Sequence, residues 1–424
     1  MLSQQTIEIV KSTAPVLAEH GQHITKRFYE MLFTNHPELL NIFNHMNQRE
    51  GRQSAALANA VYAAAVNIDR LETIIPVVKQ IGHKHRALNV KPEHYPIVGN
   101  YLLLAIKDVL GEAATDDIIA AWGEAYGVIA NAFISVEEDM YTEAKQQAGG
   151  WEGFRRFIVD RKVKESDVIT SFYLQAEDGG AIAAFEPGQY LTVRVQPAGH
   201  PNTHLRHYSL SDASGKDMYR ISVKREAGII TNDSSAAQGT GTEVGDSGMP
   251  THGVVSCYLH DAVQVGDVLE ASAPAGEFTL QQGIDTPVVL LSGGVGATPL
   301  VSMLHTLVSQ EPARQVHYVH AARNGSAHAF REEVGNVAAL QRQVQSFVCY
   351  DHPESDDNCD HQGFIDATWL QAVIPSDVWS SADVYFCGPV PFMRAMYRVL
   401  KQLGVSTDRI HYEFFGPASA IEEV

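Results

Sequence analysis

The chain has 424 residues, which is enough for about three domains of ~150 residues each. Its formal net charge of −19 argues against nucleic acid partners and against an anionic membrane surface. No apolar run approaches the ~18 residues of a membrane span, the N-terminus lacks the features of a signal peptide, and the four scattered cysteines include no CxxC pair. We therefore expect a cytoplasmic protein without an integral membrane segment, zinc site or disulfide framework.

Residues 1–148 are expected to be helical throughout, because apolar residues recur there at three- and four-residue steps. Two apolar stripes open the region, and Pro15 is predicted to kink the first. Pro96 predicts a bend or a late start in a later helix, and a last long helix is expected from Thr115 to Lys145. About seven or eight helices in this length suit a globin-like bundle.

The stretch from residue 74 to residue 88 carries the central candidate. A helix there places these residues on one face: Ile74, Val77, Val78, Ile81, His85 and Leu88. His85 then points with the apolar side chains into the interior, where one ring nitrogen can bind iron while a carbonyl or carboxylate holds the other. The alternatives are a hydrogen-bonded core histidine and, with His83 and Lys84, a solvated helix end.

The composition changes after the helix-stopping glycines of QQAGGW at residues 146–151. Short, alternating, β-branched stretches follow at residues 156–164, 168–176, 190–196 and 219–225. Turn residues separate them, which predicts a small antiparallel barrel. The motifs of this region are PGQY at 187–190, RHYS at 206–209 and GVVS at 253–256. A strand with alternating aromatic residues, common in any barrel, is the simpler explanation of the second motif.

A third pattern begins with the compact apolar strand PVVLL at residues 287–291. SGGVGATP at 292–299 and an apolar helix follow it, an order that places backbone amides and a helix N-terminus against a diphosphate. Further strands are expected at 316–320, 346–350 and 383–386, and the last leads into a CGP turn and a helix over 392–403. A glycine turn without a ligand is the alternative. Cys387 as a nucleophile is disfavoured, because the sequence places no base beside it.

Several segments of the first region resemble the globin domain of the flavohemoglobins, and the resemblance extends along essentially the whole chain. They are FYE at 28–30, NHPELLNIFN at 35–44, NQREGRQ at 47–53, KH at 84–85, KPEHYPIVG at 91–99 and AWGEAYGVIAN at 121–131. RxYS and GGVGxTP resemble the flavin and nicotinamide motifs of the ferredoxin-reductase superfamily. The resemblance implies an all-α globin domain with heme b (1–148), an antiparallel β-barrel FAD domain (151–282) and an α/β parallel-sheet NAD(P)-binding domain (285–424).

The resemblance also implies roles around the heme. His85 would be the proximal ligand, with Tyr95 and Glu137 behind it as an orienting pair that makes the imidazole more basic. Tyr29 and Gln53 would lie on the distal side, where polar donors stabilise the charge that bound oxygen carries. Considered one at a time, Tyr29 could be an ordinary core tyrosine and Gln53 an ordinary surface amide. An acidic helix face would explain Glu137, because two further acidic residues follow it.

For the other cofactors the resemblance implies longer sets of residues. Lys84, beside the iron ligand, is assigned to cofactor binding, as is the flavin set of Tyr190, Arg206, His207, Tyr208, Ser209, Gly253, Val254, Val255, Ser256, Glu413, Phe414, Phe415, Gly416 and Pro417. The nicotinamide set is Gly293, Gly294, Val295, Gly296, Ala297, Thr298, Cys387, Gly388 and Pro389. Arg206 would neutralise the flavin phosphate, and Tyr208 and Ser209 would lie at the flavin ring. Residues 229–252 exceed the family pattern and are expected to form a surface loop.

The implied reaction is that of a nitric oxide dioxygenase, which converts NO and O2 to nitrate and so detoxifies nitric oxide. A nicotinamide passes only hydride and a heme accepts one electron at a time, so FAD is required between NAD(P)H and the heme. The alternatives are an oxygen- or NO-binding sensor and a general NAD(P)H-dependent flavin or ferric reductase. The choice between NADH and NADPH stays open, although Arg323 could meet a 2′-phosphate. A lipid ligand of the heme pocket is also open, and a monomer is expected.

Overall fold

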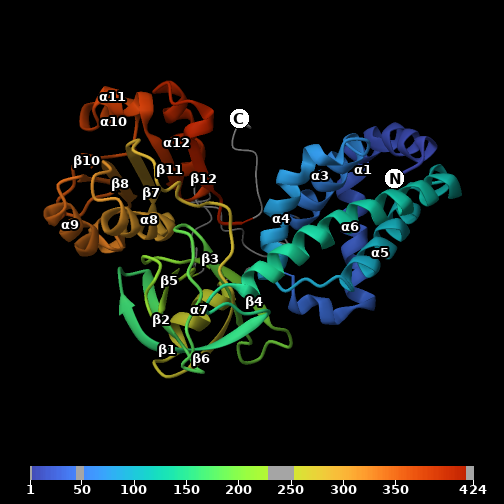
Figure 1. The fold of residues 1–424 in the computed structure, drawn as a ribbon, viewed down its shortest axis with the longest axis horizontal. Helices are drawn as coiled ribbons and strands as arrows, with labels where there is room; N and C mark the ends of the chain where they lie inside the picture. The colour runs from blue at the N-terminus through green and yellow to red at the C-terminus, as the bar shows by residue number, and fades with distance from the viewer. Residues whose placement is uncertain (1, 44–51, 228–252, 417–424) are drawn as a thin grey trace, which may run out of the picture.

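The computed structural model describes residues 2–43, 52–227 and 253–416, and Figure 1 shows three bodies that follow one another along the chain. A helical bundle comes first, an antiparallel β-barrel follows, and a parallel sheet flanked by helices comes last. The expected fold class is confirmed. Residues 229–252 and Pro417 lie outside the described residues, as does most of the NQREGRQ segment.

The described part of the bundle contains five α-helices and three short 3-10 helices. Their bounds are α1 Gln4–Asn35, η1 Pro37–Asn41, α3 Arg52–Val66, η2 Leu71–Ile74, α4 Ile75–Ala87, α5 His94–Leu110, η3 Gly111–Ala113 and α6 Asp116–Gln146. The predicted last helix is α6, and the Thr115 side chain caps it by accepting a hydrogen bond from the Ile118 amide. The late start predicted from Pro96 is confirmed, because α5 begins at His94 and this proline lies in a first turn that needs no amide donor.

The two apolar stripes at the start belong to one continuous helix. α1 runs for 32 residues and passes through Pro15 without a break. Val10, Ala14 and Leu17 form a buried face across this point, while Pro15 itself is exposed. Packing of that face therefore outweighs the roughly 3 kcal/mol that a proline costs inside a helix.

By length and composition alone, α6 is one described helix that is long and apolar enough to cross a membrane. A single match of this kind is weak support, because the core helix of a globular protein meets the same criterion. α6 packs against α1, α4 and α5, and it carries Glu137, which is 3% exposed. These are the contacts of a central helix in a bundle.

The barrel is a single sheet in which every strand pairing is antiparallel. Its strands are β1 Phe154–Lys164, β2 Ile169–Ala176, β3 Tyr190–Val195, β4 His204–Ser209, β5 Tyr219–Lys224 and β6 Val268–Ser272. The order is β4-β3-β6-β1-β2-β5, and a bridge between Leu210 and Ile221 joins the edges. Alternate side chains such as Phe157 and Val159 point into one shared core. Each stretch predicted from alternation corresponds to one of these strands.

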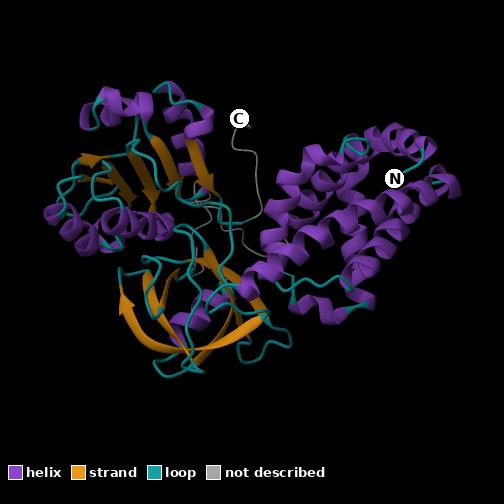
Figure 2. Ribbon diagram, viewed as in Figure 1, coloured by secondary structure: helices purple, strands orange, loops and turns teal. Residues whose placement is uncertain are grey.

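The third body is a parallel sheet in the order β10-β9-β8-β7-β11-β12. Its strands are β7 Val288–Gly293, β8 Val316–Ala322, β9 Val344–Tyr350, β10 His361–Gln362, β11 Asp383–Cys387 and β12 Ile410–Glu413. One face is covered by α8 Ala297–Gln310 and α9 Arg331–Leu340, and the other by α10 Ala367–Val373, α11 Ser376–Ser381 and α12 Val390–Gln402 (Figure 2). Strand β7 is buried on both faces, as expected for a central parallel strand.

The barrel and the parallel sheet are joined by a shared core and by a buried ion pair. Ile169 and Phe278 pack in the same cluster as β7 and α8. Arg220 of β5 is 4% exposed and donates two hydrogen bonds of 2.9 Å to the carboxylate of Glu333 in α9. His305 of α8 bonds the same carboxylate. Burial raises the pKa of Glu333, but the hydrogen bonds from His305 and Arg220 and the Arg220 charge outweigh it and lower this pKa to about 2.

Replacing Glu333 with Gln should destabilise the protein, because it leaves Arg220 buried without its charge partner. We expect a loss of about 3 kcal/mol in the free energy of unfolding at neutral pH. Since the folded-state pKa of Glu333 is depressed, its stabilisation is complete above the ordinary value of 4.5 and is lost as the pH falls toward 2. The variant and the parent should therefore converge in acid, as measured by urea denaturation across pH.

The matched control is Glu177→Gln, which removes the exposed partner of Arg156 and should leave the urea midpoint unchanged. A Glu333→Gln protein that equals the parent in stability at neutral pH would contradict the prediction.

Candidate functional site

His85 lies in the last turn of α4, and its Nδ1 is held from two other helices. Nδ1 donates a hydrogen bond of 2.7 Å to Oε1 of Glu137 in α6, and the Tyr95 hydroxyl of α5 lies 3.1 Å from the same nitrogen. Tyr95 donates to the same Oε1 at 2.6 Å. Among the described residues, no hydrogen bond reaches Nε2 of His85. This arrangement places the proton on Nδ1 and leaves Nε2 as the nitrogen that is available to a ligand.

The carboxylate of Glu137 points into the bundle. Glu137 is 3% exposed, whereas the neighbouring Glu138 and Asp139 are exposed, so an acidic solvent face does not explain it. Burial raises the pKa of Tyr95, and the charge of Glu137 and the hydrogen bond to it raise this pKa further. The phenol therefore remains a donor. The Tyr126 hydroxyl donates to the Tyr95 carbonyl at 2.6 Å and holds the start of α5 in place.

The helix face around His85 is buried only in part. Val78 is 2% exposed, but Val77 is 47% exposed and the His85 side chain is 32% exposed. The expected interior face is thus buried at Val78 but not at Val77, and the His85 ring is only partly buried, which leaves one side of it open. An imidazole packed against protein atoms on every side has no room for a metal, so the open side fits a ligand role for Nε2.

Helices α1 and α3 pack against each other in antiparallel register. Thr25 donates from its hydroxyl to the Ser54 carbonyl at 2.9 Å, and one turn earlier a Cβ added at Gly21 would lie 3.2 Å from the Cβ of Ala58. Continuing this register by one further turn carries Tyr29 past Arg52, where the described part of α3 begins. The N-terminal end of α3 is therefore the end of that helix nearer to Tyr29.

The predicted distal pair lies at that same end of the two helices. Tyr29 is 7% exposed, and its ring centroid lies 5.6 Å from that of Phe33 and 5.7 Å from that of Phe43. Gln53 is half-buried in the first turn of α3. Tyr29 and Gln53 thus lie toward the same end of the packed helix pair, although more than twenty residues separate them in the chain.

The RHYS motif lies on β4, in register with β3. Tyr190 pairs with Ser209, and Tyr208 follows on the same ladder. Arg206 donates to the carbonyl of the residue before it, and burial lowers the pKa of its guanidinium. Within the described ranges no carboxylate forms an ion pair with Arg206, so its charge is available to an anion such as a phosphate. The His207 ring centroid lies 4.6 Å from that of Tyr190.

The GVVS motif is the opening turn of a helix rather than an isolated turn. α7 runs from Val254 to Asp261 with Gly253 as its N-cap. The Gly253 amide donates to the Glu226 carbonyl at 2.8 Å, and the Ser256 hydroxyl donates back to the Gly253 carbonyl at 3.1 Å. The expected phosphate-facing amides are therefore those of a helix N-terminus.

Lys84, Tyr190 and Glu413 meet where the three bodies converge. The Tyr190 hydroxyl and Oε2 of Glu413 are buried, and neither has a hydrogen-bond partner among the described residues. Burial raises the pKa of Glu413 to about 7, against the opposing effect of the Lys84 charge. Native proteins rarely leave such atoms unsatisfied, so this junction fits a polar ring system. Phe415 is 47% exposed, and half-buried Phe414 leads to it.

The predicted strand, glycine turn and helix are β7, η4 Gly294–Gly296 and α8. Gly296 lies so close to the CGP turn that an added Cβ would be 2.1 Å from the Cys387 carbonyl oxygen, which only glycine permits. Ser292 and Cys387 are paired at the carboxyl ends of β7 and β11, where α/β sheets bind ligands. Cys387 is fully buried, and burial raises the pKa of its thiol well above the ordinary value, so it is no nucleophile.

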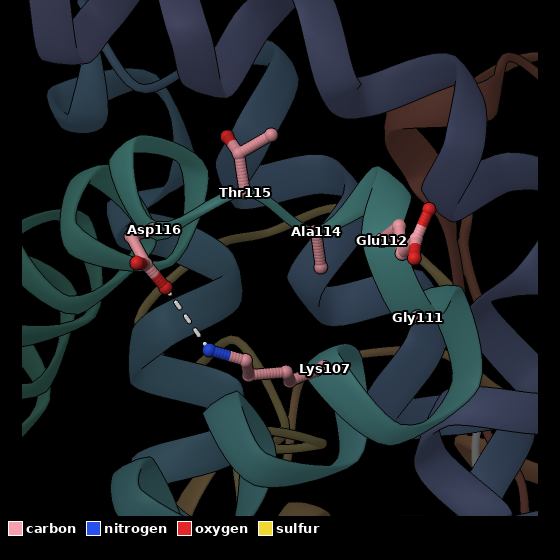
Figure 3. Close-up of a pocket in the computed structure, with 6 residues that line it drawn as sticks. All are labelled: Lys107, Gly111, Glu112, Ala114, Thr115 and Asp116. Atoms are coloured by element: carbon pink, nitrogen blue, oxygen red, sulfur yellow. Dashed lines mark hydrogen bonds and ion pairs between the residues drawn. The ribbon is translucent and has the colours of Figure 1, made fainter.

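An open surface pocket lies away from all of these residues. Figure 3 shows this pocket, which has a volume of about 620 Å³. Its lining consists of Lys107, Gly111, Glu112, Ala114, Thr115 and Asp116. An exposed ion pair of 3.0 Å joins Lys107 to Asp116. Lys107 is at the opposite end of α5 from Tyr95, roughly 18 Å along the helix axis, so the pocket takes no part in the site around His85.

The sequence patterns did not identify Arg86, a buried residue next to His85. It is 7% exposed and donates to the carbonyls of Ala273 and Pro274, beyond the end of β6. The sequence signal that could have identified Arg86 is the run of basic residues Lys84-His85-Arg86. Basic residues are common at a helix C-terminus because they oppose its dipole, and that ordinary role hid the separate contacts of the three side chains.

Comparisons with known proteins agree with this architecture. A globin family model matches residues 26–133, an oxidoreductase FAD-binding domain model matches residues 156–280, and an oxidoreductase NAD-binding domain model matches residues 290–398. The chain is 57% identical to a flavohemoprotein of Bacillus thuringiensis subsp. konkukian over the full length of both chains. It is 49% identical to a flavohemoprotein of Bacillus subtilis, also over both full lengths.

Solved structures give the same result. The flavohemoglobin of Malassezia yamatoensis, with bound FAD and heme, aligns with a TM-score of 0.80 at 26% identity, over 98% of this chain and all of that one. The FAD/NAD-binding domain of a nitric oxide dioxygenase from Vibrio cholerae aligns at 39% identity with a TM-score of 0.53, over 62% of this chain and 99% of that one.

Glu137→Gln should weaken the hydrogen bond that makes His85 electron-rich. In the heme-loaded protein we expect a lower iron–histidine stretching frequency in the resonance Raman spectrum and a higher heme reduction potential, because a less basic imidazole stabilises ferric iron less. Glu138→Gln is the matched control. Glu138 is the exposed neighbour of Glu137, so this variant should change neither the stretching frequency nor the reduction potential. Equal spectra for the two variants would sink the orienting role of Glu137.

Proposed function

Because this chain belongs to the flavohemoprotein family, we propose that it is a nitric oxide dioxygenase, which converts NO and O2 to nitrate with electrons from NAD(P)H. Its globin, FAD-binding and NAD-binding parts make it an oxidoreductase that uses heme, FAD and a nicotinamide nucleotide. The observation that carries the proposal is His85, whose Nδ1 is bonded to buried Glu137. The Vibrio cholerae relative, a nitric oxide dioxygenase, supports the same reaction.

The heme would supply the iron that takes up O2, FAD would split a two-electron hydride into single electrons, and the nicotinamide would supply that hydride. We assign the three domains to residues 1–148, 151–282 and 285–424. NO and O2 are the small-molecule partners, and we place the protein in the cytoplasm, where its four free cysteines stay reduced.

On the proximal side, His85 would present Nε2 to the iron. The Nδ1 proton is shared with a buried carboxylate, which makes the imidazole a stronger donor than a free histidine. Tyr95 holds that carboxylate in place from a second helix. His85, Glu137 and Tyr95 therefore favour oxygen chemistry over oxygen storage, because an electron-rich ligand favours activation of oxygen over its release.

On the distal side, Tyr29 and Gln53 would orient the diatomic ligand. Both belong to the end of α1 and the start of α3, and the aromatic rings around Tyr29 exclude water from it. A phenol donor stabilises negative charge that develops on the ligand, and a dry setting strengthens this interaction. The same residues would hold O2 until NO arrives.

The electron route would pass from the third domain to the first. The glycine turn at Gly293–Thr298 and the CGP turn would bind the nicotinamide nucleotide at the ends of β7 and β11. Arg206 and the α7 N-terminus would hold the flavin phosphates. Lys84, Tyr190 and Glu413 would surround the flavin ring, since two of them offer buried polar atoms without protein partners among the described residues.

The purified protein should show heme and flavin absorption together, and its oxygenated form should yield nitrate when it is mixed with NO in a stopped-flow instrument. His85→Ala should abolish both the heme band and NO consumption, while NADH still reduces FAD. His23→Ala, on the exposed side of α1, is the control and should behave like the parent. Formation of no nitrate would favour an oxygen or NO sensor. NO consumption that survives in His85→Ala would favour a general flavin reductase.

Tyr29→Phe removes one hydrogen-bond donor with little change of shape. We expect the O2 dissociation rate to rise about 10- to 100-fold, the equivalent of one hydrogen bond to a charged group. Stopped-flow mixing of the oxygenated ferrous protein with excess carbon monoxide measures this rate. Tyr62→Phe, at a tyrosine that is 41% exposed on α3, serves as the control. An unchanged dissociation rate would exclude Tyr29 from the distal site.

A further inference from the structure

We propose that Arg86 is a positioning residue that docks the iron-ligand helix on the flavin barrel and thereby sets the rate of flavin-to-heme electron transfer. The inference rests on the proposed function, because it assumes that electrons reach the heme through FAD. It concerns a residue that neither touches the iron ligand's ring nor belongs to any of the binding motifs in the sequence.

The last turn of α4 is a rigid support for this residue. The helix ends in a left-handed Asn89 with φ of 63°, whose amide donates to the Arg86 carbonyl at 3.0 Å. The Val90 amide donates to the His85 carbonyl at 2.9 Å, which completes the cap. The Tyr141 hydroxyl of α6 donates to the Val90 carbonyl at 2.6 Å. The backbone of His85 and Arg86 is therefore fixed as one unit.

Arg86 extends from this unit into the second domain. Its Nη1 donates to the Ala273 carbonyl at 3.3 Å and its Nη2 donates to the Pro274 carbonyl. The residue is 7% exposed, and within the described ranges its guanidinium forms no ion pair. A buried cation that is held only by carbonyls is costly, so these two contacts have a positional role that a surface arginine lacks.

The residues on either side extend the contact to the flavin site. Ala87 is fully buried against Tyr190 and Ala275, which form a small cluster of their own. Tyr190 and Ala275 exchange two backbone hydrogen bonds of 2.9 and 3.0 Å. The segment that receives Arg86 is thus bonded directly to Tyr190, one of the residues proposed to lie beside the flavin. Arg86 therefore connects the backbone of the iron ligand to the backbone of the flavin site.

An arginine suits this position because its planar guanidinium can donate to two carbonyls at once, whereas lysine presents a single point charge. His83, in the same turn of the helix, is 3.9 Å from Glu277, which is beyond hydrogen-bond length, and Lys84 interacts with the charge of Glu413 in the third domain. Among the basic residues of this turn, Arg86 alone makes direct hydrogen bonds to the described residues of the barrel.

The test separates the two electron-transfer steps in the full chain loaded with heme and FAD. Anaerobic mixing with NADH under carbon monoxide reports FAD reduction and heme reduction at separate wavelengths. In Arg86→Met we expect FAD reduction within about twofold of the parent and heme reduction slower by about 10- to 100-fold, as for a misplacement on the order of 1 Å. Arg86→Lys should recover part of the rate, and Lys79→Met, at an exposed residue of the same helix, should change neither step.

A second measurement needs no turnover. Hydrogen–deuterium exchange of the Tyr190 and Ala275 amides should become at least about tenfold faster in Arg86→Met, because the docked segment opens more often. An unchanged heme reduction rate overturns the proposal, as does an equal slowing of both steps. If Arg86→Met fails to bind both cofactors, Arg86→Lys takes its place. The proposal is then overturned if the ratio of the heme reduction rate to the FAD reduction rate equals that of the parent. Because NO takes no part in these assays, a failure to form nitrate would overturn the proposed function and leave the docking role standing.

Discussion

The hydrogen bond from Nδ1 of His85 to Glu137 is the interaction on which the rest of the molecule depends. A carboxylate that is 3% exposed is stable only when its oxygens are bonded. Here α4 and α5 each supply a donor to it from side chains that α6 alone could not orient. Packing of the bundle therefore directs Nε2 outward from a closed polar group. The hydrogen bonds to Nδ1 thus fix the direction in which Nε2 of His85 points.

The barrel is bonded to both of the other bodies. It shares a core and the Arg220–Glu333 pair with the parallel sheet, and it receives Arg86 and Ala87 from the bundle. The last turn of α4 reaches all three bodies: Lys84 faces Glu413, His85 bonds Glu137 and Arg86 bonds the barrel. One helical turn thus carries the residue that we propose as the iron ligand, a charge near Glu413 and the hydrogen bonds to the barrel. The three consecutive basic residues therefore make three separate sets of contacts.

Sequence patterns predicted the elements better than the contacts between them. Periodicity located α4, α6 and the barrel strands, because each depends on which residues are apolar along a short stretch. The strand, glycine turn and helix at Gly293–Thr298 followed from steric rules that act locally. Arg86 and Pro274 are 188 positions apart, and Arg220 and Glu333 are 113 apart, so no local pattern pairs them. Glu137 illustrates the limit, because only the rotation of α6 separates it from its exposed neighbours.

The barrel makes a larger apolar contact with the parallel sheet than with the helical bundle. Toward the parallel sheet, the barrel contributes to a large continuous cluster that includes Phe278 and Leu280. Toward the bundle, the apolar contact is smaller: Ala87 packs with Tyr190 and Ala275, and Ala144 of α6 joins the barrel core. Buried apolar area sets how strongly two bodies hold together, so we expect the barrel to be held more firmly by the parallel sheet than by the bundle. In mild denaturant, we therefore expect the helical bundle to separate from the other two bodies before these separate from each other.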